Sequence, residues 1–262
     1  MSLTISNLTV AIPQCAIIRN VSLSLQKGEL VGLIGANGAG KSTLLKAILG
    51  IGGGQDKNQS GLVRLDGQDI AKLSPRARAR RIAYLPQEHR VEWNLSVRDV
   101  VALGRFAHQS WLGNPSASCV KIIDDCMART ETTSLATRSF SVLSGGEKAR
   151  VLLARAMAGQ TPFLLADEPV AALDPLHQLQ VMTLLRQSAQ NGQGVLAVIH
   201  DLTLAMRYMD RVLLMNRGEI IAQGPPQQVL TKENLASAFG ITPLAGQHQG
   251  EDWLIPWKKS DE

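Results

Sequence analysis

The chain has 262 residues, of which 45% are hydrophobic and 19% charged, and its formal net charge at pH 7 is +5. This composition is that of a globular protein with a sizeable core and excludes a low-complexity chain. No apolar run approaches the ~20 residues that span a bilayer, and the start Met1-Ser2-Leu3-Thr4 lacks a signal-peptide pattern, so we expect a protein that is soluble by itself.

The first segment predicts antiparallel strands. Between Leu3 and Leu25 apolar residues alternate with polar ones, as in Val21-Ser22-Leu23-Ser24-Leu25. A second hairpin is expected over Val63 to Ile70, with its turn at Asp66-Gly67. The polar, glycine-rich residues 52–61 read as a surface loop. Together the strands indicate a small antiparallel β-subdomain.

A phosphate-binding loop lies between the two hairpins. The apolar run Leu30–Ile34 is followed by Gly35-Ala36-Asn37-Gly38-Ala39-Gly40-Lys41-Ser42-Thr43, which matches G-x-x-x-x-G-K-S/T between a strand and a helix. The glycines let backbone N–H groups curl around phosphate oxygens at the positive end of the helix. Lys41 would reach the β- and γ-phosphates and Ser42 would bind Mg²⁺. The pattern predicts a nucleoside-triphosphate site, and we expect no metal other than the Mg²⁺ carried by the nucleotide.

The middle of the chain is predicted to be helical. From about Leu95 to Arg138 apolar residues recur at helical spacing, as at Val97, Val100 and Val101. Before this segment, the basic cluster of Arg76, Arg78, Arg80 and Arg81 lacks interleaved aromatic residues. We interpret the cluster as a solvated helix face and expect no nucleic acid partner.

Ser144 predicts a capped helix start. Glu147 follows three residues later, which is the capping-box spacing, and a helix is expected through Met157 to about Gly159. With Gly145 and Gly146 in its first turn, such a helix start can bind an anion. Taken alone, it is also compatible with an ordinary capped helix.

Two carboxylates follow the next apolar run. Phe163–Ala166 reads as a buried parallel strand, and Asp167 and Glu168 end it at the sheet edge where the phosphate loop also lies. Asp167 would complete the Mg²⁺ shell, and Glu168 would polarise an attacking water. These roles predict a nucleotide hydrolase. The alternative is a solvated acidic strand end.

The last core elements are a strand and a hairpin. His200 follows the apolar run Val195–Ile199, and by itself it is more typical of a strand-end residue than of a catalytic one. Apolar residues 212–215 and 220–222 flank Asn216-Arg217-Gly218-Glu219, which predicts a hairpin that closes the sheet edge.

The segment Leu143-Ser144-Gly145-Gly146-Glu147-Lys148-Ala149-Arg150 closely resembles the signature motif of ATP-binding cassette (ABC) ATPases, usually written LSGGQ. The resemblance implies an α/β fold with a RecA-like P-loop NTPase core, an N-terminal antiparallel β-subdomain and an inserted helical subdomain. We expect one ABC ATPase domain over 1–262. Residues 1–90 and 155–225 would form the β-subdomain and core, 91–154 the helical subdomain, and 226–262 a C-terminal tail.

The resemblance also implies further site residues. Gln87 looks like the glutamine of the Q-loop, which contacts both Mg²⁺ and the attacking water; Asp174 looks like the aspartate of the D-loop; and His200 looks like the switch histidine at the γ-phosphate. In the family, the signature residues Ser144 to Glu147 meet the ATP held by a second copy, which implies a head-to-tail dimer closed around two ATP molecules.

The chain departs from the family pattern in two features. The place of the adenine-stacking aromatic falls on Ile12, so adenine would be held by apolar contact alone. In the D-loop, Val170 and Ala171 replace the usual Ser or Thr pair, which puts a cross-interface hydroxyl contact in doubt. Neither departure touches the groups that would perform hydrolysis.

The resemblance is closest to ATPases of bacterial importers for iron-siderophore complexes, haem and cobalamin, through residues 94–105 and 224–240. It implies two integral membrane permease subunits as partners, a periplasmic or surface binding protein in the full system, and a peripheral location at the cytoplasmic face of the cell membrane. The alternative is a soluble ABC ATPase not tied to transport, such as an iron-sulfur cluster assembly factor. A DNA-repair ATPase would need a long coiled coil, for which the sequence has no pattern.

Overall fold

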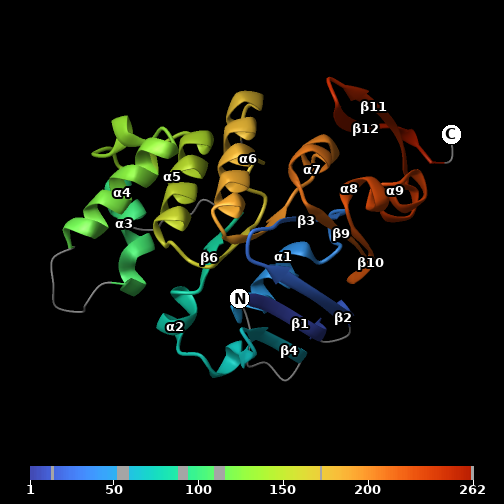
Figure 1. The fold of residues 1–262 in the computed structure, drawn as a ribbon, viewed down its shortest axis with the longest axis horizontal. Helices are drawn as coiled ribbons and strands as arrows, with labels where there is room; N and C mark the ends of the chain where they lie inside the picture. Colours follow the sequence, from blue (N-terminus) through green and yellow to red (C-terminus); the bar gives the residue numbers. More distant parts are fainter. Residues whose placement is uncertain (13–14, 52–58, 88–93, 109–115, 172, 261–262) are drawn as a thin grey trace. The chain divides into compact units, whose positions relative to one another are not determined.

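The computed structural model of the protein describes residues 1–12, 15–51, 59–87, 94–108, 116–171 and 173–260. The chain forms two compact units, one of residues 1–73 with 186–262 and one of residues 74–185. Figure 1 shows both units coloured along the sequence.

The N-terminal strands of the first unit form an antiparallel sheet with the order β2-β1-β4-β5. The strands are β1 (Ser2–Ile12), β2 (Cys15–Gln26), β4 (Gln59–Leu65) and β5 (Gln68–Asp69), and the 3₁₀ helix η1 (Ile70–Lys72) follows them. Asp66 and Gly67 both have positive φ, 51° and 79°, as a tight two-residue hairpin turn requires. The predicted β-subdomain and its second hairpin are confirmed.

A second sheet of the first unit holds the phosphate loop. In it β3 (Leu30–Gly35) pairs in parallel with both β8 (Gly194–Val198) and β9 (Arg211–Asn216), and β10 (Glu219–Gly224) pairs antiparallel with β9. Every residue of β3 and β8 is buried, as expected for parallel strands flanked on both sides. The helices α1 (Lys41–Leu49) and α7 (Leu202–Tyr208) follow β3 and β8. The hairpin β9–β10 is the one predicted from the sequence.

The segment expected as a C-terminal tail is folded. It contains α8 (Pro226–Val229), α9 (Lys232–Phe239) and a hairpin of β11 (Ile241–His248) and β12 (Glu251–Lys259). The hairpin is drawn in red in Figure 1, where it lies beside α7 and α9. Gln249 and Gly250 form its turn with φ of 52° and 82°.

The second unit joins two parallel strands to a group of helices. The strands β6 (Ile82–Leu85) and β7 (Phe163–Ala166) pair in register from Ile82 and Phe163 to Leu85 and Ala166. The α-helices are α2 (Pro75–Ala79), α3 (Val97–Ala102), α4 (Ala117–Arg129), α5 (Gly145–Ala158) and α6 (Pro175–Gln190), the last of which ends in the first unit. The 3₁₀ helices are η2 (Leu103–His108), η3 (Thr133–Leu135) and η4 (Phe140–Val142).

The helices α3 and α4 pack on α5, which confirms the predicted helical segment between Leu95 and Arg138. Gly104 allows a close approach, because a Cβ at this position would lie 2.1 Å from the backbone oxygen of Arg155. Among the helices of the described residues, none is both long enough and apolar enough to cross a bilayer.

The basic cluster does more than face solvent. Arg76 and Arg80 both donate from Nε to the carbonyl oxygen of Ala107, at 3.0 and 2.8 Å. His108 contacts the carbonyl oxygen of Gly159 through Nε2 at 3.0 Å. These side chains therefore tie η2 to α2 and to the end of α5 within the second unit.

Candidate functional site

The phosphate loop of the first unit has the backbone of an anion cradle. Gly38 and Gly40 have φ of 81° and 101°, in the left-handed region that glycine adopts without strain. The N–H of Leu44 donates to the carbonyl of Gly40 at 2.8 Å, which places Gly40 as the N-cap of α1. Because the first N–H groups of a helix lack partners within it, the loop and the start of α1 together offer donors to a phosphate.

Gly35 and Gly40 are also required by packing. A Cβ at Gly35 would lie 2.4 Å from the carbonyl oxygen of Met215, and one at Gly40 would lie 2.7 Å from Cδ1 of Ile18. At Gly38 a Cβ would meet nothing within 4 Å. Neighbouring β-strands therefore approach the loop at its two ends and leave its middle open.

Lys41 is held at the loop by its own backbone. Its side chain is buried, and Nζ donates to the carbonyl oxygens of Gly35 at 2.7 Å and Ala36 at 3.0 Å. A buried ammonium group needs such partners, and they keep its charge at the mouth of the loop. Ser42 follows, half-buried in the first turn of α1.

His200 lies at the same sheet edge as the loop. The N–H of Ile199 donates to the carbonyl of Leu33 at 3.2 Å, so the chain after β8 stays beside the end of β3. His200 is exposed, and Asp201 caps α7 by accepting from the N–H of Leu204 at 2.8 Å. The structure therefore brings His200 to the edge that carries Gly35 to Thr43. Ile12 ends β1, but its side chain lies outside the described part of the structure.

The predicted carboxylates and the Q-loop glutamine lie together in the second unit. The N–H of Asp167 donates to the carbonyl of Leu85 at 2.8 Å, which continues the β6–β7 pairing and brings the residues after both strands side by side. Asp167 is 1% exposed. Tyr84 donates from its hydroxyl to Oδ2 of Asp167 at 3.4 Å, and burial together with the Asp167 charge raises the pKa of Tyr84. Tyr84 thus remains a neutral donor beside the carboxylate.

Gln87 and Glu168 are joined directly. Nε2 of Gln87 donates to Oε2 of Glu168 at 2.8 Å. Glu168 has φ of 52°, a conformation that non-glycine residues adopt at a cost, and such strain tends to occur at functional sites. The left-handed backbone turns the chain sharply after β7, and the amide of Gln87 orients the carboxylate.

Asp174 and the signature residues both begin helices. Asp174 accepts from the N–H of His177 at 3.0 Å and contacts Nδ1 of its ring at 2.7 Å, and the backbone bond in particular lowers the pKa of Asp174. Ala172, in the same loop, lies outside the described residues. At α5 the capping box is present as predicted: Ser144 Oγ accepts from the N–H of Glu147, and Glu147 Oε2 accepts from the N–H of Ser144 at 2.8 Å.

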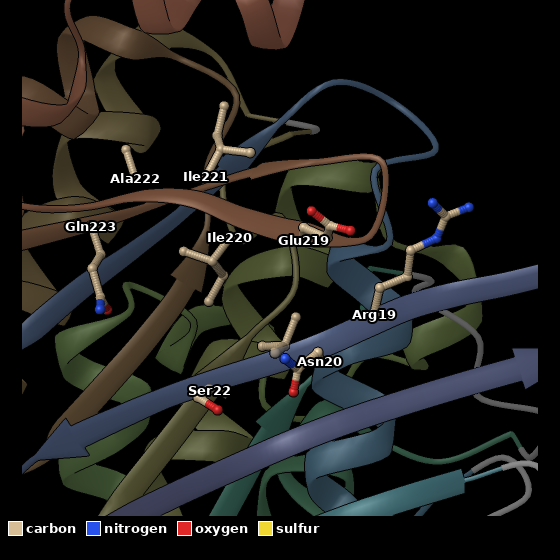
Figure 2. Close-up of a pocket in the computed structure, with 9 residues that line it drawn as sticks. Arg19, Asn20, Ser22, Glu219, Ile220, Ile221, Ala222 and Gln223 are labelled. Carbon is tan, nitrogen blue, oxygen red and sulfur yellow. The ribbon is translucent and has the colours of Figure 1, made fainter.

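A separate cavity of about 540 Å³ lies between β2 and β10 in the first unit. Figure 2 shows the residues that line it, among them Arg19 and Asn20 from one strand and Glu219 and Gln223 from the other. None of the loop residues Gly35 to Thr43 lines this cavity. This cavity is therefore distinct from the phosphate loop.

Each unit carries oxygen ligands of the hard kind that Mg²⁺ prefers. In the second unit these are the Gln87 amide oxygen and the buried Asp167 carboxylate, and in the first unit the Ser42 hydroxyl next to the phosphate loop. Several supporting residues were not singled out from the sequence, namely Tyr84, His177, Asp201 and Met215. Of these, Asp201 had a signal, because an aspartate directly before the helical run Leu202–Tyr208 is a typical N-cap.

The fold and these two groups of residues define a P-loop nucleotide-binding protein of the α/β class. The family model for ABC transporters matches residues 18–171, more than half of the chain, and the chain belongs to this family.

The relatives are import ATP-binding proteins by name. The chain is 40% identical to the hemin import ATP-binding protein HmuV of Bordetella pertussis over 250 residues, which cover 92% of this chain and 93% of that protein. It is 41% identical to the cobalamin import ATP-binding protein BtuD of Halobacterium salinarum over 247 residues, or 94% of this chain. The chain spans only 61% of the length of that BtuD.

Solved structures agree on the fold. A putative metal-chelate type ABC transporter in an inward-facing conformation matches with a TM-score of 0.82 at 27% identity, over 100% of this chain and 99% of that one. The dimeric bacterial ABC transporter cassette MJ0796 matches with a TM-score of 0.76 at 27% identity, over 86% of this chain and 98% of that one. The predicted fold class and family are thereby confirmed.

Proposed function

We propose that this chain is the ATP-hydrolysing subunit of an ABC importer and powers the uptake of iron-siderophore, haem or cobalamin-type cargo through membrane partner subunits. The observation that carries the hydrolase assignment is the hydrogen bond between Gln87 and Glu168 next to the buried Asp167. It gives one carboxylate an orientation suited to a base and leaves the other as a candidate metal ligand.

The roles of the residues follow from their chemistry. The loop from Gly35 to Thr43 binds the phosphates through its N–H groups, and the Lys41 ammonium neutralises the β- and γ-phosphates. Ser42, Gln87 and Asp167 hold Mg²⁺, which offsets the charge of the phosphate oxygens. Glu168 accepts a proton from the attacking water, and His200 donates to the γ-phosphate. Ile12 contributes an apolar contact to adenine.

A second copy completes each site on this proposal. The capped start of α5, with Ser144, Gly145, Gly146 and Glu147, presents N–H donors to the γ-phosphate bound by the other copy, and Asp174 lies at the contact between the copies. The similarity to a cassette whose structure is dimeric supports this arrangement. The resulting dimer is head-to-tail and closes around two Mg-ATP.

The importer assignment rests on the relatives named for hemin and cobalamin import. On this assignment the chain binds two integral membrane permease subunits at the cytoplasmic face of the cell membrane, and a periplasmic or surface binding protein belongs to the full system. The alternative, a soluble ABC ATPase such as a cluster-assembly factor, has no relative in support among those described above.

Co-purification separates the two functions. The tagged chain, expressed in its native organism and extracted with detergent, should co-purify with two membrane subunits. The ATPase activity of this complex should rise when it is reconstituted with cargo-loaded binding protein. A Glu168→Gln variant serves as the control, because it should retain the same subunits without turnover. Recovery of the chain with soluble partners only would contradict the importer assignment and leave the hydrolase assignment intact.

A further inference from the structure

The segment after Glu168 folds into a short turn that leads to α6. The N–H of Ala171 donates to the carbonyl of Glu168 at 3.3 Å, and the N–H of Leu173 donates to the carbonyl of Val170 at 3.2 Å. Val170 and Leu173 are buried, whereas Asp174 at the end of the turn is exposed. The candidate base and Asp174 are therefore joined by a short hydrogen-bonded segment within the second unit.

The first turn of α6 holds this segment at two places. Nε2 of Gln178 donates to the carbonyl of Val170 at 3.3 Å, and the N–H of Gln178 donates to the carbonyl of Asp174 at 2.9 Å. His177 bonds to both oxygens of the Asp174 carboxylate, from its N–H at 3.0 Å and from its ring Nδ1 at 2.7 Å. Because Val170 and Ala171 have apolar side chains, they cannot form such bonds themselves, and side chains of α6 hold the segment instead.

The His177 ring adds a constraint that a helix cap alone does not give. The bond from the His177 N–H satisfies one of the free donors at the start of α6, but it directs only one oxygen of Asp174. The ring binds the second oxygen, and since an ionised carboxylate can only accept, Nδ1 carries the proton. The His177 side chain is 24% exposed and that of Asp174 59% exposed. The inner side chain thus fixes the orientation of the outer one.

We propose that His177 is a positioning residue for ATP hydrolysis, which fixes the orientation in which Asp174 meets the second copy. This inference rests on the proposed function, in which Asp174 lies at the contact between the copies. A carboxylate that is already fixed loses less side-chain freedom when the copies close than one that rotates freely. His177 therefore favours closure of the composite sites, and with it turnover, by acting through Asp174.

Two substitutions at position 177 test the role of the ring donor. His177→Leu removes the donor, whereas His177→Asn restores it, because Nδ2 of asparagine can take the place of Nδ1 of the ring. Steady-state phosphate release by the full chain with Mg-ATP is the measurement. His177→Leu should lower kcat about five- to tenfold, as the loss of one hydrogen bond can, with the KM for ATP unchanged. His177→Asn should retain most of the wild-type kcat.

A second background tests whether His177 acts through Asp174. Asp174→Ser keeps a capping oxygen for the His177 N–H but lacks the second oxygen that accepts from the ring. In this background His177→Leu should lower kcat no further, because the partner of the ring is already absent. Gln180→Leu is the matched control: it removes another side-chain hydrogen bond of α6, from Nε2 of Gln180 to Glu131 at 3.1 Å, and should leave kcat unchanged.

The other results overturn the inference. Wild-type kcat in His177→Leu, or an equal loss in His177→Asn or Gln180→Leu, would mean that the donor at position 177 does not set the rate. A raised KM with unchanged kcat would place the effect in ATP binding. A further loss in the Asp174→Ser background would mean that His177 acts by another route. All of these results leave the hydrolase assignment intact, whereas a wild type without turnover would refute the proposed function and this inference with it.

Discussion

At the scale of single residues, the side chains that orient the carboxylates differ from those that carry the charge. Gln87 and Tyr84 hold the carboxylates, while Glu168 and Asp167 provide the charge. In the present arrangement the Gln87 amide donates to one oxygen of Glu168 and so fixes the orientation of this carboxylate.

The first prediction concerns Glu168. Glu168→Gln preserves shape but removes the base, so ATP turnover should fall by roughly 10²–10⁴-fold while ATP binding survives. The ATP-bound dimer should then accumulate on size-exclusion chromatography with Mg-ATP. Unchanged turnover would remove Glu168 from the mechanism.

At the scale of elements, the sequence predicted best those features whose geometry depends on residues close together in the chain. The capping box at Ser144 and the turn at Asp66-Gly67 depend on neighbours within a few residues, so local propensity is enough to predict them. The Gln87–Glu168 bond joins residues 81 positions apart, and its geometry depends on the pairing of β6 with β7. No local pattern specifies such a contact.

The C-terminal hairpin escaped prediction for a different reason. Pro243 and Pro256 interrupt its strands, and proline inside an apolar run argues against a strand. The two prolines face each other across the hairpin, next to the shift in register. The hairpin is held to α7 by the hydrogen bonds between the Thr203 hydroxyl and the backbone of Leu254. Tertiary contact has here overridden local propensity.

The second prediction uses the side chains that hold η2. Burial, followed by the charges of Arg105, Arg80 and Arg76, lowers the pKa of His108 below its ordinary value of 6.5. Because the folded state disfavours the protonated ring, this contribution to stability is complete above pH 6.5 and is lost as the pH falls below it. Urea unfolding of the full chain should show a larger loss of stability between pH 7.5 and pH 5.5 for the wild type than for His108→Gln.

The glutamine variant is a matched control, because its amide can still donate to the Gly159 carbonyl but does not titrate. All other groups titrate alike in the two proteins. Equal losses in both would mean that protonation of His108 does not affect the fold.

At the scale of the whole molecule, the proposed chemistry is shared between copies. The third prediction is that Lys41→Ala and Ser144→Arg each abolish most ATPase activity alone. Mixing them should restore part of it, because one composite site then carries both defects and the other carries neither. Steady-state phosphate release from the separate and mixed variants measures the effect. If mixing restores nothing, each copy uses its own signature or the assignment of Ser144 is wrong.

The contact of Gly35 with Met215 distinguishes two kinds of mutational intolerance within one loop. A survey of all single substitutions scored by abundance in the cell would find Gly35 intolerant, because any side chain is driven into the Met215 carbonyl and the sheet itself must open. Gly38 faces open space at φ of 81°, so Asn in its place would lower abundance little. The same survey scored by growth on imported cargo would penalise both positions. Comparing the two scores would thus separate the glycine that the sheet needs from the glycine that the phosphate needs.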